Sequence, residues 1–240
     1  TATNLAAVDQ GTDTPVNNFA TFNPLNIPTA NVPTFSEGNC EVVSQDAAGK
    51  HFGGTSTSGM TAGKWYWECS PTSVTNGSLI GITGQPATEA YLNDYPGQSA
   101  AFSYAYIDNG EKITGNSGEA YGDTYTDGDI VGVALDITNL KIYFSKNGVW
   151  QDSGDPTSGA SGTGAAYTIT APASVTEGFY AFGAGDYSSG PTTLQANFGG
   201  CSAFTVSSAA SDGNGYGNFE YAPPSGYLAL CTKNLGSDGG

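Results

Sequence analysis

The chain has 240 residues, and its 38% hydrophobic and 12% aromatic content is enough for a packed core, so the many glycines do not indicate a disordered chain. Its 22 acidic residues against 6 lysines and arginines give a formal charge of −16 at pH 7. Because nucleic-acid binding depends on clustered cationic side chains, this charge excludes nucleic acid as a partner and disfavours anionic membranes. No run of about eighteen apolar residues occurs, so membrane insertion is not expected.

Residues 1–35 form the first predicted segment, an extended N-terminal arm. Prolines among Asn and Thr exclude a long helix there. Apolar residues nevertheless recur through it, namely Phe19, Phe22, Leu25, Ile27, Val32 and Phe35. A free linker is seldom so apolar, so we expect the arm to pack on the body of the domain or on a neighbouring subunit.

Several short strands follow between turn residues. In residues 64–69 (KWYWEC) the two tryptophans and Cys69 share one face and the intervening residues share the other, which predicts a half-buried strand. Similar patterns predict strands at residues 78–82, 100–107, 130–137, 178–183, 193–199 and about 227–232. No segment shows a sustained helical period, so an all-β sandwich or barrel is expected.

Residues 141–150 give the clearest local signal. Asn147-Gly148 stands between two apolar segments, and this pair tolerates the positive φ angles of a type I′ turn, so a β-hairpin is predicted. Residues 152–166 consist almost wholly of Gly, Ser, Ala, Thr, Asp and Pro and are predicted to form a mobile loop.

Five motifs occur in an order that resembles the SPRY domain. They are residues 63–68 (GKWYWE), 81–82 (GI), 128–136 (GDIVGVALD), 144–148 (FSKNG) and 197–199 (NFG). The resemblance implies two packed antiparallel sheets of concanavalin-like shape. SPRY domains are generally protein-interaction modules whose binding loops vary, so the motif residues are expected to be scaffold. We therefore expect a two-sheet antiparallel β-sandwich over residues 36–235 and a flexible tail at residues 236–240.

The flanks of this region resemble those of SPRY-containing structural proteins of tailed bacteriophages. The similar segments are residues 14–25, 35–39 and 221–230. The resemblance implies a non-enzymatic component of a virion surface, such as a tail fibre, that is extracellular and assembles with other virion proteins or with copies of itself as a homo-oligomer. A lectin-like module that binds a host receptor or glycan is the alternative, and a polysaccharide hydrolase on the same fold is a third hypothesis.

Aromatic and acidic residues in predicted loops are the candidates for ligand binding. Such residues can stack on sugar rings or anchor a protein contact. They are Tyr91, Asp94, Tyr95, Tyr121, Tyr125, Asp186 and Tyr187. The alternative is that these tyrosines merely fold over the edges of the sheets.

No motif indicates catalysis, a cofactor or a metal. The single histidine, His51, is not accompanied by a G-x-S-x-G elbow, so a hydrolase triad is not expected. Residues 212–217 begin like a calcium loop, but Tyr216 stands at a ligand position and no Glu closes the loop. A glycosidase needs two facing carboxylates, and Glu68 and Glu111 are as readily explained as solvated strand or turn residues.

The cysteines leave two alternatives open. Cys40, Cys69, Cys201 and Cys231 contain no C-x-x-C pair, so zinc and dithiol redox motifs are not indicated. Two disulfides are possible, in any of three connectivities, and free buried thiols are an equal alternative.

Overall fold

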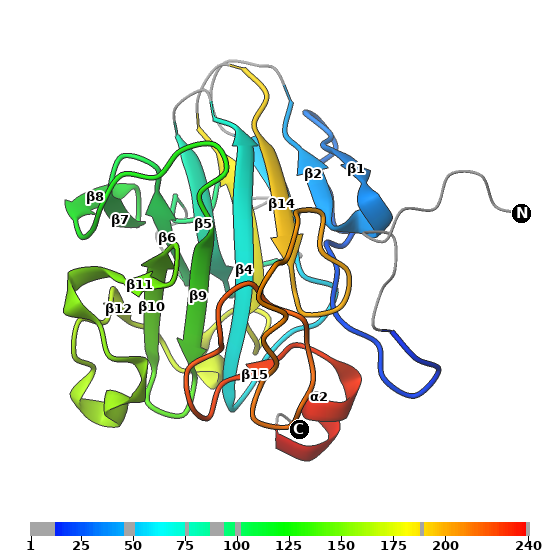
Figure 1. Ribbon diagram of the computed structural model, residues 1–240. Coiled ribbons are helices and arrows are strands. Elements are labelled where there is room, and N and C mark those ends of the chain that lie inside the picture. Colours follow the sequence, from blue (N-terminus) through cyan, green and yellow to red (C-terminus); the bar gives the residue numbers. More distant parts are fainter. Residues whose placement is uncertain are drawn as a thin grey trace, which may run out of the picture.

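The computed structural model describes residues 13–45, 51–74, 77–86, 94–98, 102–187 and 190–238. These residues form two sheets packed face to face, with helices confined to short segments (Figure 1). The expected all-β, two-sheet antiparallel sandwich is thereby confirmed.

The larger sheet has nine strands among the described residues. Its order is β1 (Thr34–Ser36), β2 (Glu41–Val43), β14 (Thr193–Asn197), β4 (Lys64–Ser73), β9 (Val131–Asp136), β10 (Lys141–Lys146) and β11 (Val149–Trp150). β12 (Tyr167–Thr168) also pairs with β10, and β15 (Leu228–Ala229) pairs with β4 in parallel orientation.

In the described part of the chain, the smaller sheet has six strands. Its order is β3 (His51–Thr55), β13 (Ala181–Asp186), β5 (Ser78–Thr83), β6 (Ser103–Ile107), β7 (Glu111–Thr114) and β8 (Ser117–Ala120). The strands are antiparallel, and a bulge between β13 and β3 shifts their register.

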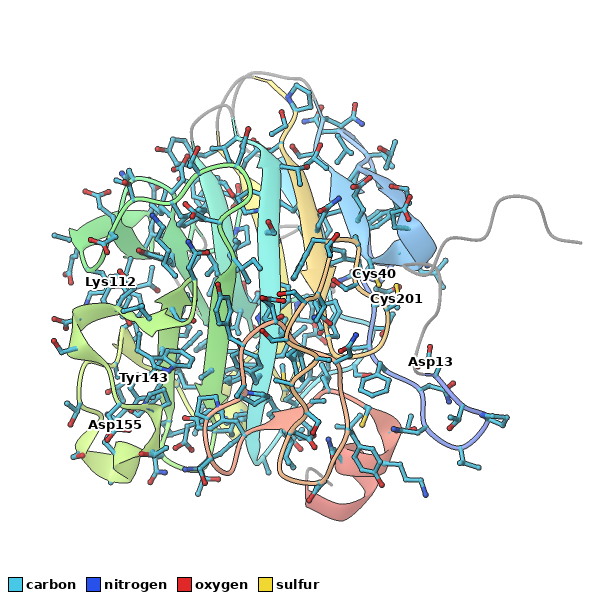
Figure 2. All side chains as sticks on the ribbon, viewed as in Figure 1. Asp13, Cys40, Lys112, Tyr143, Asp155 and Cys201 are labelled. Atoms are coloured by element: carbon cyan, nitrogen blue, oxygen red, sulfur yellow. The ribbon has the colours of Figure 1, made fainter. Side chains whose placement is uncertain are left out.

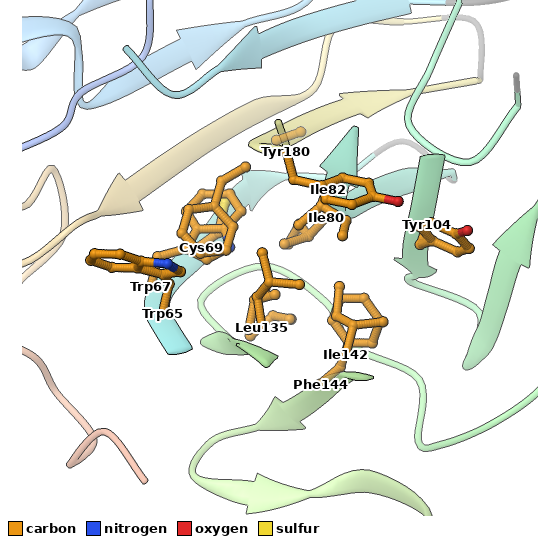
Figure 3. Packing of buried hydrophobic residues seen from close by; sticks show 14 of the residues in the cluster. Trp65, Trp67, Cys69, Ile80, Ile82, Tyr104, Leu135, Ile142, Phe144 and Tyr180 are labelled. Carbon is orange, nitrogen blue, oxygen red and sulfur yellow. The ribbon is translucent and has the colours of Figure 1, made fainter. Parts of the chain in front are cut away.

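Trp67 of β4 lies in the core between the sheets. Its ring stacks on Phe198, with centroids 5.1 Å apart and an interplanar angle of 8°, and packs on Phe182 of the facing sheet at 4.9 Å. Phe22, from the N-terminal segment, meets the ring of Trp67 edge-on at 6.5 Å. Figure 3 shows the side chains of β4 facing those of β5 across this interior. The inward face predicted from the alternation of β4 is therefore correct.

The described part of the N-terminal segment runs along the sandwich. The Ala20 N–H donates to the Leu230 carbonyl (2.9 Å), and the Phe22 N–H donates to that of Asn39 (2.9 Å). Phe22 is fully buried, whereas Leu25 is 91% exposed. The Phe22 side chain of this segment therefore belongs to the core of its own chain, whereas Leu25 stays on the surface.

A C-terminal cover, residues 202–238, crosses the outer face of the larger sheet in front of β4 (Figure 1). Tyr66, on the outward face of β4, packs against Phe219 of the cover with ring centroids 5.1 Å apart, and Tyr227 joins the same cluster. β4 is therefore buried on both faces over most of its length. The prediction of a half-buried strand is wrong, because distant residues close the face that the local pattern assigned to solvent.

The segment after β11 is more regular than predicted. It contains the short helices η3 (Gln151–Ser153) and η4 (Pro156–Ser161). The Ala166 N–H donates to the Ile142 carbonyl (2.8 Å), and the Tyr227 hydroxyl donates to the Pro156 carbonyl (2.9 Å). These bonds tie residues 152–166 to β10 and to the C-terminal cover, so the segment is held rather than a free loop.

Helix α2 (Thr232–Asp238) covers part of the tail predicted at residues 236–240. The side chain of Asn234 is buried and donates to Asp212 Oδ2 (2.7 Å). Seven residues are too few to reveal a helical period in the sequence, and residues 239 and 240 lie outside the described part. η2 (Glu37–Asn39) and η5 (Pro172–Ser174) are shorter still. None of the described helices combines the length and apolarity needed to cross a membrane.

The predicted hairpin is present and is tied to the turn before β9. Asn147 and Gly148 have φ of 48° and 79°, which confirms positive φ at both turn residues between β10 and β11. Asn147 Oδ1 accepts from the Ile130 N–H (2.8 Å), and its Nδ2 donates to Asp129 Oδ1 (2.6 Å). Lys146 Nζ lies 3.3 Å from Asp129 Oδ2. These motif residues hold two turns together.

Asn147→Ala is expected to lower the free energy of unfolding by about 2 kcal/mol, because alanine disfavours positive φ and the Ile130 N–H loses its acceptor. Asn147→Gly, which restores the backbone freedom but not the hydrogen bonds, should recover part of this loss. Urea-induced unfolding followed by circular dichroism measures both changes. Equal stability of the alanine variant and the wild type would contradict the assigned role.

Candidate functional site

The ends of several strands meet at one end of the sandwich, the upper end in Figure 1. β4 ends there, and β5 begins beside the end of β13, because Ser78 pairs with Asp186. The Asp108 N–H, just after β6, donates to the Ser78 carbonyl (3.1 Å), and the Gly128 N–H donates to the Pro71 carbonyl (2.8 Å). Antiparallel pairing therefore brings the ends of β4, β6 and β13 and the beginning of β5 to this end.

A hollow of 520 Å³ opens between these loops. The described residues that line it are Val74, Asp108, Asn109, Thr124, Tyr125, Thr126 and Tyr187. They include neither Lys nor Arg, so the lining offers hydrogen-bond acceptors, hydroxyl groups and aromatic surface without a cation.

Tyr187 is the exposed aromatic residue of the hollow, with 39% of its surface accessible. Its ring packs on that of Tyr95 (centroids 5.5 Å apart), and the Tyr95 hydroxyl donates to Asn116 Oδ1 (2.5 Å). Gly77 lies against the Tyr187 ring with φ of +98°, and a Cβ at Gly77 would be only 2.7 Å from the ring. The ring is thus held in place from two sides.

Asp108 supplies a carboxylate beside this ring. Its Oδ2 accepts from the Gly77 N–H (2.9 Å). Burial raises the pKa of Asp108 above its ordinary value, against backbone hydrogen bonds that lower it. Burial likewise raises the pKa of the Tyr187 phenol, and the negative charges of Asp108 and Glu111 add to the effect. An aromatic face with negative charge nearby is suited to a cationic ligand group.

The structure brings only some of the sequence candidates to this site. Tyr187 lines the hollow, and Tyr95 packs on its ring but is itself buried, with 8% of its surface exposed, and is not part of the lining. Burial, and to a smaller extent the charge of Asp94, raises the pKa of Tyr95. Asp186 is fully buried and accepts from the Ser44 hydroxyl. Tyr91 lies outside the described residues.

Tyr121 and Tyr125 are core residues, in contrast to the expectation of exposed loop positions. Tyr121 is 8% exposed, packs on Tyr106 (centroids 5.6 Å apart) and donates to the Gly164 carbonyl (3.2 Å). Tyr125 is 3% exposed, and its hydroxyl donates to the Ser78 carbonyl (2.8 Å). Both rings fill space between the sheets, where their hydroxyl groups find backbone acceptors.

Sequence reasoning missed Asp108 and Asn109. The Asp-Asn-Gly run that follows β6 is a turn signal that could have placed these residues in a loop. No feature of the sequence around Asp108 shows that this loop lies beside Tyr187, which follows Asp108 by 79 positions.

The segment that begins like a calcium loop has another role. Asp212 Oδ1 accepts from the Asn214 and Tyr216 N–H groups (2.9 Å each), while its Oδ2 accepts from the Ala229 N–H (2.9 Å). The carboxylate therefore organises the C-terminal cover. Among the residues described by the structure, no three His, Cys, Asp or Glu side chains gather where they could hold a metal ion.

Glu68 is buried rather than solvated. It accepts from the Tyr66 hydroxyl (3.1 Å), Asn197 Nδ2 (3.1 Å) and the N–H groups of Glu220 (3.0 Å) and Tyr221 (2.7 Å). Burial raises its pKa to about 7, although each of these bonds lowers it. Glu68 fastens the C-terminal cover to β4.

The other residues considered for catalysis are apart from one another. Glu68 belongs to β4 of the larger sheet, and Glu111 belongs to β7 of the smaller one, where it accepts from Asn109 Nδ2 (3.0 Å). They do not form a pair across one cleft. His51 opens β3, at an edge of the smaller sheet.

The strand order, the packed core and the loop-built hollow define a concanavalin-like β-sandwich. Residues 64–179 match the SPRY domain, so the resemblance seen in the motifs is confirmed for this part of the chain. The SPRY domain of human HERC1 superposes with a TM-score of 0.55 at 18% identity, over 77% of this chain and 99% of that one. At this identity the likeness establishes the fold.

Two curated proteins share shorter stretches. The chain is 35% identical over 83 residues to the dual specificity protein kinase splA of Dictyostelium discoideum, which is 32% of this chain and 3% of the kinase. It is 29% identical over 90 residues to the Ran-binding proteins 9/10 homolog of Drosophila melanogaster, which is 37% of this chain and 9% of that protein. The chain thus spans a small part of each relative.

Proposed function

We propose that the chain is a non-enzymatic protein-binding module that holds a basic segment of a partner in the hollow beside Tyr187. SPRY domains are generally protein-interaction modules, and the match over residues 64–179 supports this class. The observation that carries the proposal is the exposed, braced ring of Tyr187 in a hollow lined by acceptors and by no described cation.

The chemistry of the hollow favours a Lys or Arg side chain of the partner. A cation over the face of Tyr187 would be attracted by the ring, while the Asp108 carboxylate and the Asn109 amide supply negative charge and acceptors. The formal charge of −16 would also draw a basic partner toward the domain over distances of about a Debye length. This charge affects the association rate more than the final affinity.

Tyr187→Ala is expected to weaken binding of such a segment about tenfold or more, because a central aromatic anchor is lost. Peptides would be selected from a displayed random library on the wild-type domain, and their Kd measured by fluorescence anisotropy. Selected peptides should be rich in Lys and Arg and should bind more weakly as salt rises.

Leu25→Ala is the matched control, because Leu25 is 91% exposed and belongs to the N-terminal segment instead of the hollow. It should leave the Kd unchanged, and thermal unfolding of both variants checks that they fold. The proposal fails if no basic peptide is selected, or if selected peptides bind the Tyr187→Ala variant as tightly as the wild type.

A virion setting remains part of the proposal on the resemblance of the flanks alone. The two curated relatives come from Dictyostelium and Drosophila and do not point to a virion. Assembly into a homo-oligomer on a virion surface predicts a multimer in light scattering and the presence of the chain in purified particles. A glycan array tests the lectin-like alternative, since the same hollow offers an aromatic face and acceptors to a sugar.

A further inference from the structure

Two cysteines that are far apart in the sequence meet at one place. The Sγ atoms of Cys40 and Cys201 lie 2.6 Å apart, and both residues are free thiols in the structure (Figure 2). An S–S bond is about 2.05 Å long, so little movement separates this pair from a covalent link. Independently fixed turns hold the two residues.

The turn that carries Cys40 is unusual. Glu37, Gly38 and Asn39 all have positive φ, at 50°, 64° and 63°. The Ala196 N–H of β14 then donates to the Cys40 carbonyl (2.7 Å). Left-handed backbone at non-glycine residues such as Glu37 and Asn39 is costly, and it persists only where surrounding contacts fix it. Here the fixed turn aims a buried cysteine at Cys201.

The turn that carries Cys201 is equally constrained. Gly199 has φ of +101°, and Asn197 and Ser202 form a β-bridge around the turn. Phe19 packs so closely on Gly200 that a Cβ there would lie 2.6 Å from the Phe19 side chain. These contacts hold Cys201 beside Cys40, with the two Sγ atoms 2.6 Å apart.

The two thiols differ in access. Cys201 is partly exposed and lines a hollow of 270 Å³ together with Asp13, Thr21 and Glu37, whereas Cys40 is fully buried. The hydrogen bond between the two thiols lowers the pKa of Cys201, and the same bond together with burial raises that of Cys40. Cys201 is therefore the thiol that an oxidant reaches first.

We propose that Cys40 and Cys201 are a built disulfide site, which closes by exchange with a small-molecule disulfide such as oxidised glutathione. The Cys201 thiolate attacks one sulfur of the oxidant, forms a mixed disulfide and releases one glutathione thiolate. Cys40 then loses its proton, attacks Cys201 Sγ and releases the second glutathione. Two protein thiols are oxidised, and one glutathione disulfide is reduced to two thiols.

The other two cysteines stay reduced under the same treatment. Burial raises the pKa of Cys69, which faces the core, and that of Cys231, which is buried between the C-terminal cover and the larger sheet. Buried thiols of raised pKa react slowly. The new bond would join the corner between β1 and β2 to the start of the C-terminal cover.

The test uses the wild-type chain incubated with oxidised glutathione, unfolded, alkylated with N-ethylmaleimide and mapped by mass spectrometry. We expect two alkylated cysteines, Cys69 and Cys231, and one peptide pair linked through Cys40 and Cys201. Thermal unfolding of the oxidised protein should shift upward by on the order of 5–10 °C relative to the reduced protein.

Two variants test the order of the steps. Cys40→Ala should stop at the mixed disulfide and carry one glutathione on Cys201, whereas Cys201→Ala should acquire none. The proposal is overturned if Cys40 and Cys201 of the wild type are both found alkylated after equilibration with excess oxidant. It is also overturned if the disulfide involves Cys69 or Cys231. The cysteine mapping of the wild-type chain tests the proposal even if a variant fails to fold.

Discussion

Replacing Trp67 by alanine is expected to lower the free energy of unfolding by about 3–5 kcal/mol. The side chain is fully buried, and its ring centroid lies 5.1 Å from that of Phe198 and 4.9 Å from that of Phe182. The indole therefore packs the two sheets together. Its indole N–H has no acceptor among the described residues, and the loss is therefore one of packing rather than of a hydrogen bond. Such a loss is a large share of the typical stability of a domain, about 5–15 kcal/mol.

The measurement is urea-induced unfolding followed by far-ultraviolet circular dichroism, because the substitution removes a fluorophore. Trp67→Phe keeps an aromatic ring in the same place and should cost markedly less than the alanine change. Val149→Ala, at a residue that is 67% exposed, should change stability by no more than about 0.5 kcal/mol. A cost below about 1 kcal/mol for Trp67→Ala would contradict the packing described.

Stability is also expected to fall as the pH rises from about 4.5 to about 7, because of Glu68. Its pKa is raised from 4.5 to about 7 by burial in the folded chain. Below this window the carboxyl is protonated in both states, and above it the carboxyl is ionised in both. Within it the folded state keeps a proton that the unfolded state has released, which amounts to about 3 kcal/mol lost across the window.

Glu68→Gln is the matched control, since glutamine has similar size and does not titrate in this range. The difference in free energy of unfolding between wild type and variant, measured at several pH values, isolates the contribution of Glu68 from that of the other acidic residues. Between pH 4.5 and pH 7 the wild type should lose about 3 kcal/mol of unfolding free energy relative to the variant. A difference that does not change with pH would show that the pKa of Glu68 is not raised.

Local patterns predicted much of the scaffold. The strand around Trp67, with its inward face, and the Asn147-Gly148 turn depend on neighbouring residues, so the local sequence was enough to predict them. The order of the SPRY motifs then supplied the arrangement of the sheets. Short strands such as β7 and β8 carried too little pattern to be seen.

Contacts between distant segments could not be predicted in this way. Glu68 meets the Glu220 N–H across 152 positions of the chain, and nothing near Glu68 in the sequence marks it as covered. The loop tyrosines show the same limit. Tyr121 is buried and Tyr187 is exposed, and the sequence around each residue does not distinguish the two cases. Of the candidates named from the sequence, only Tyr125 and Tyr187 line the hollow, and Tyr95 lies buried against the Tyr187 ring.

The strand order sets the smallest piece of the chain that can fold by itself. β14 lies between β2 and β4, and β13 lies between β3 and β5, yet both strands fall outside residues 64–179. A recombinant fragment limited to the region of family similarity would lose an interior strand from each sheet and the cover over Tyr66. Its edges would be unpaired and its apolar faces exposed, which favours aggregation. Boundaries for expressing this domain should therefore enclose everything from the Phe22 segment through α2.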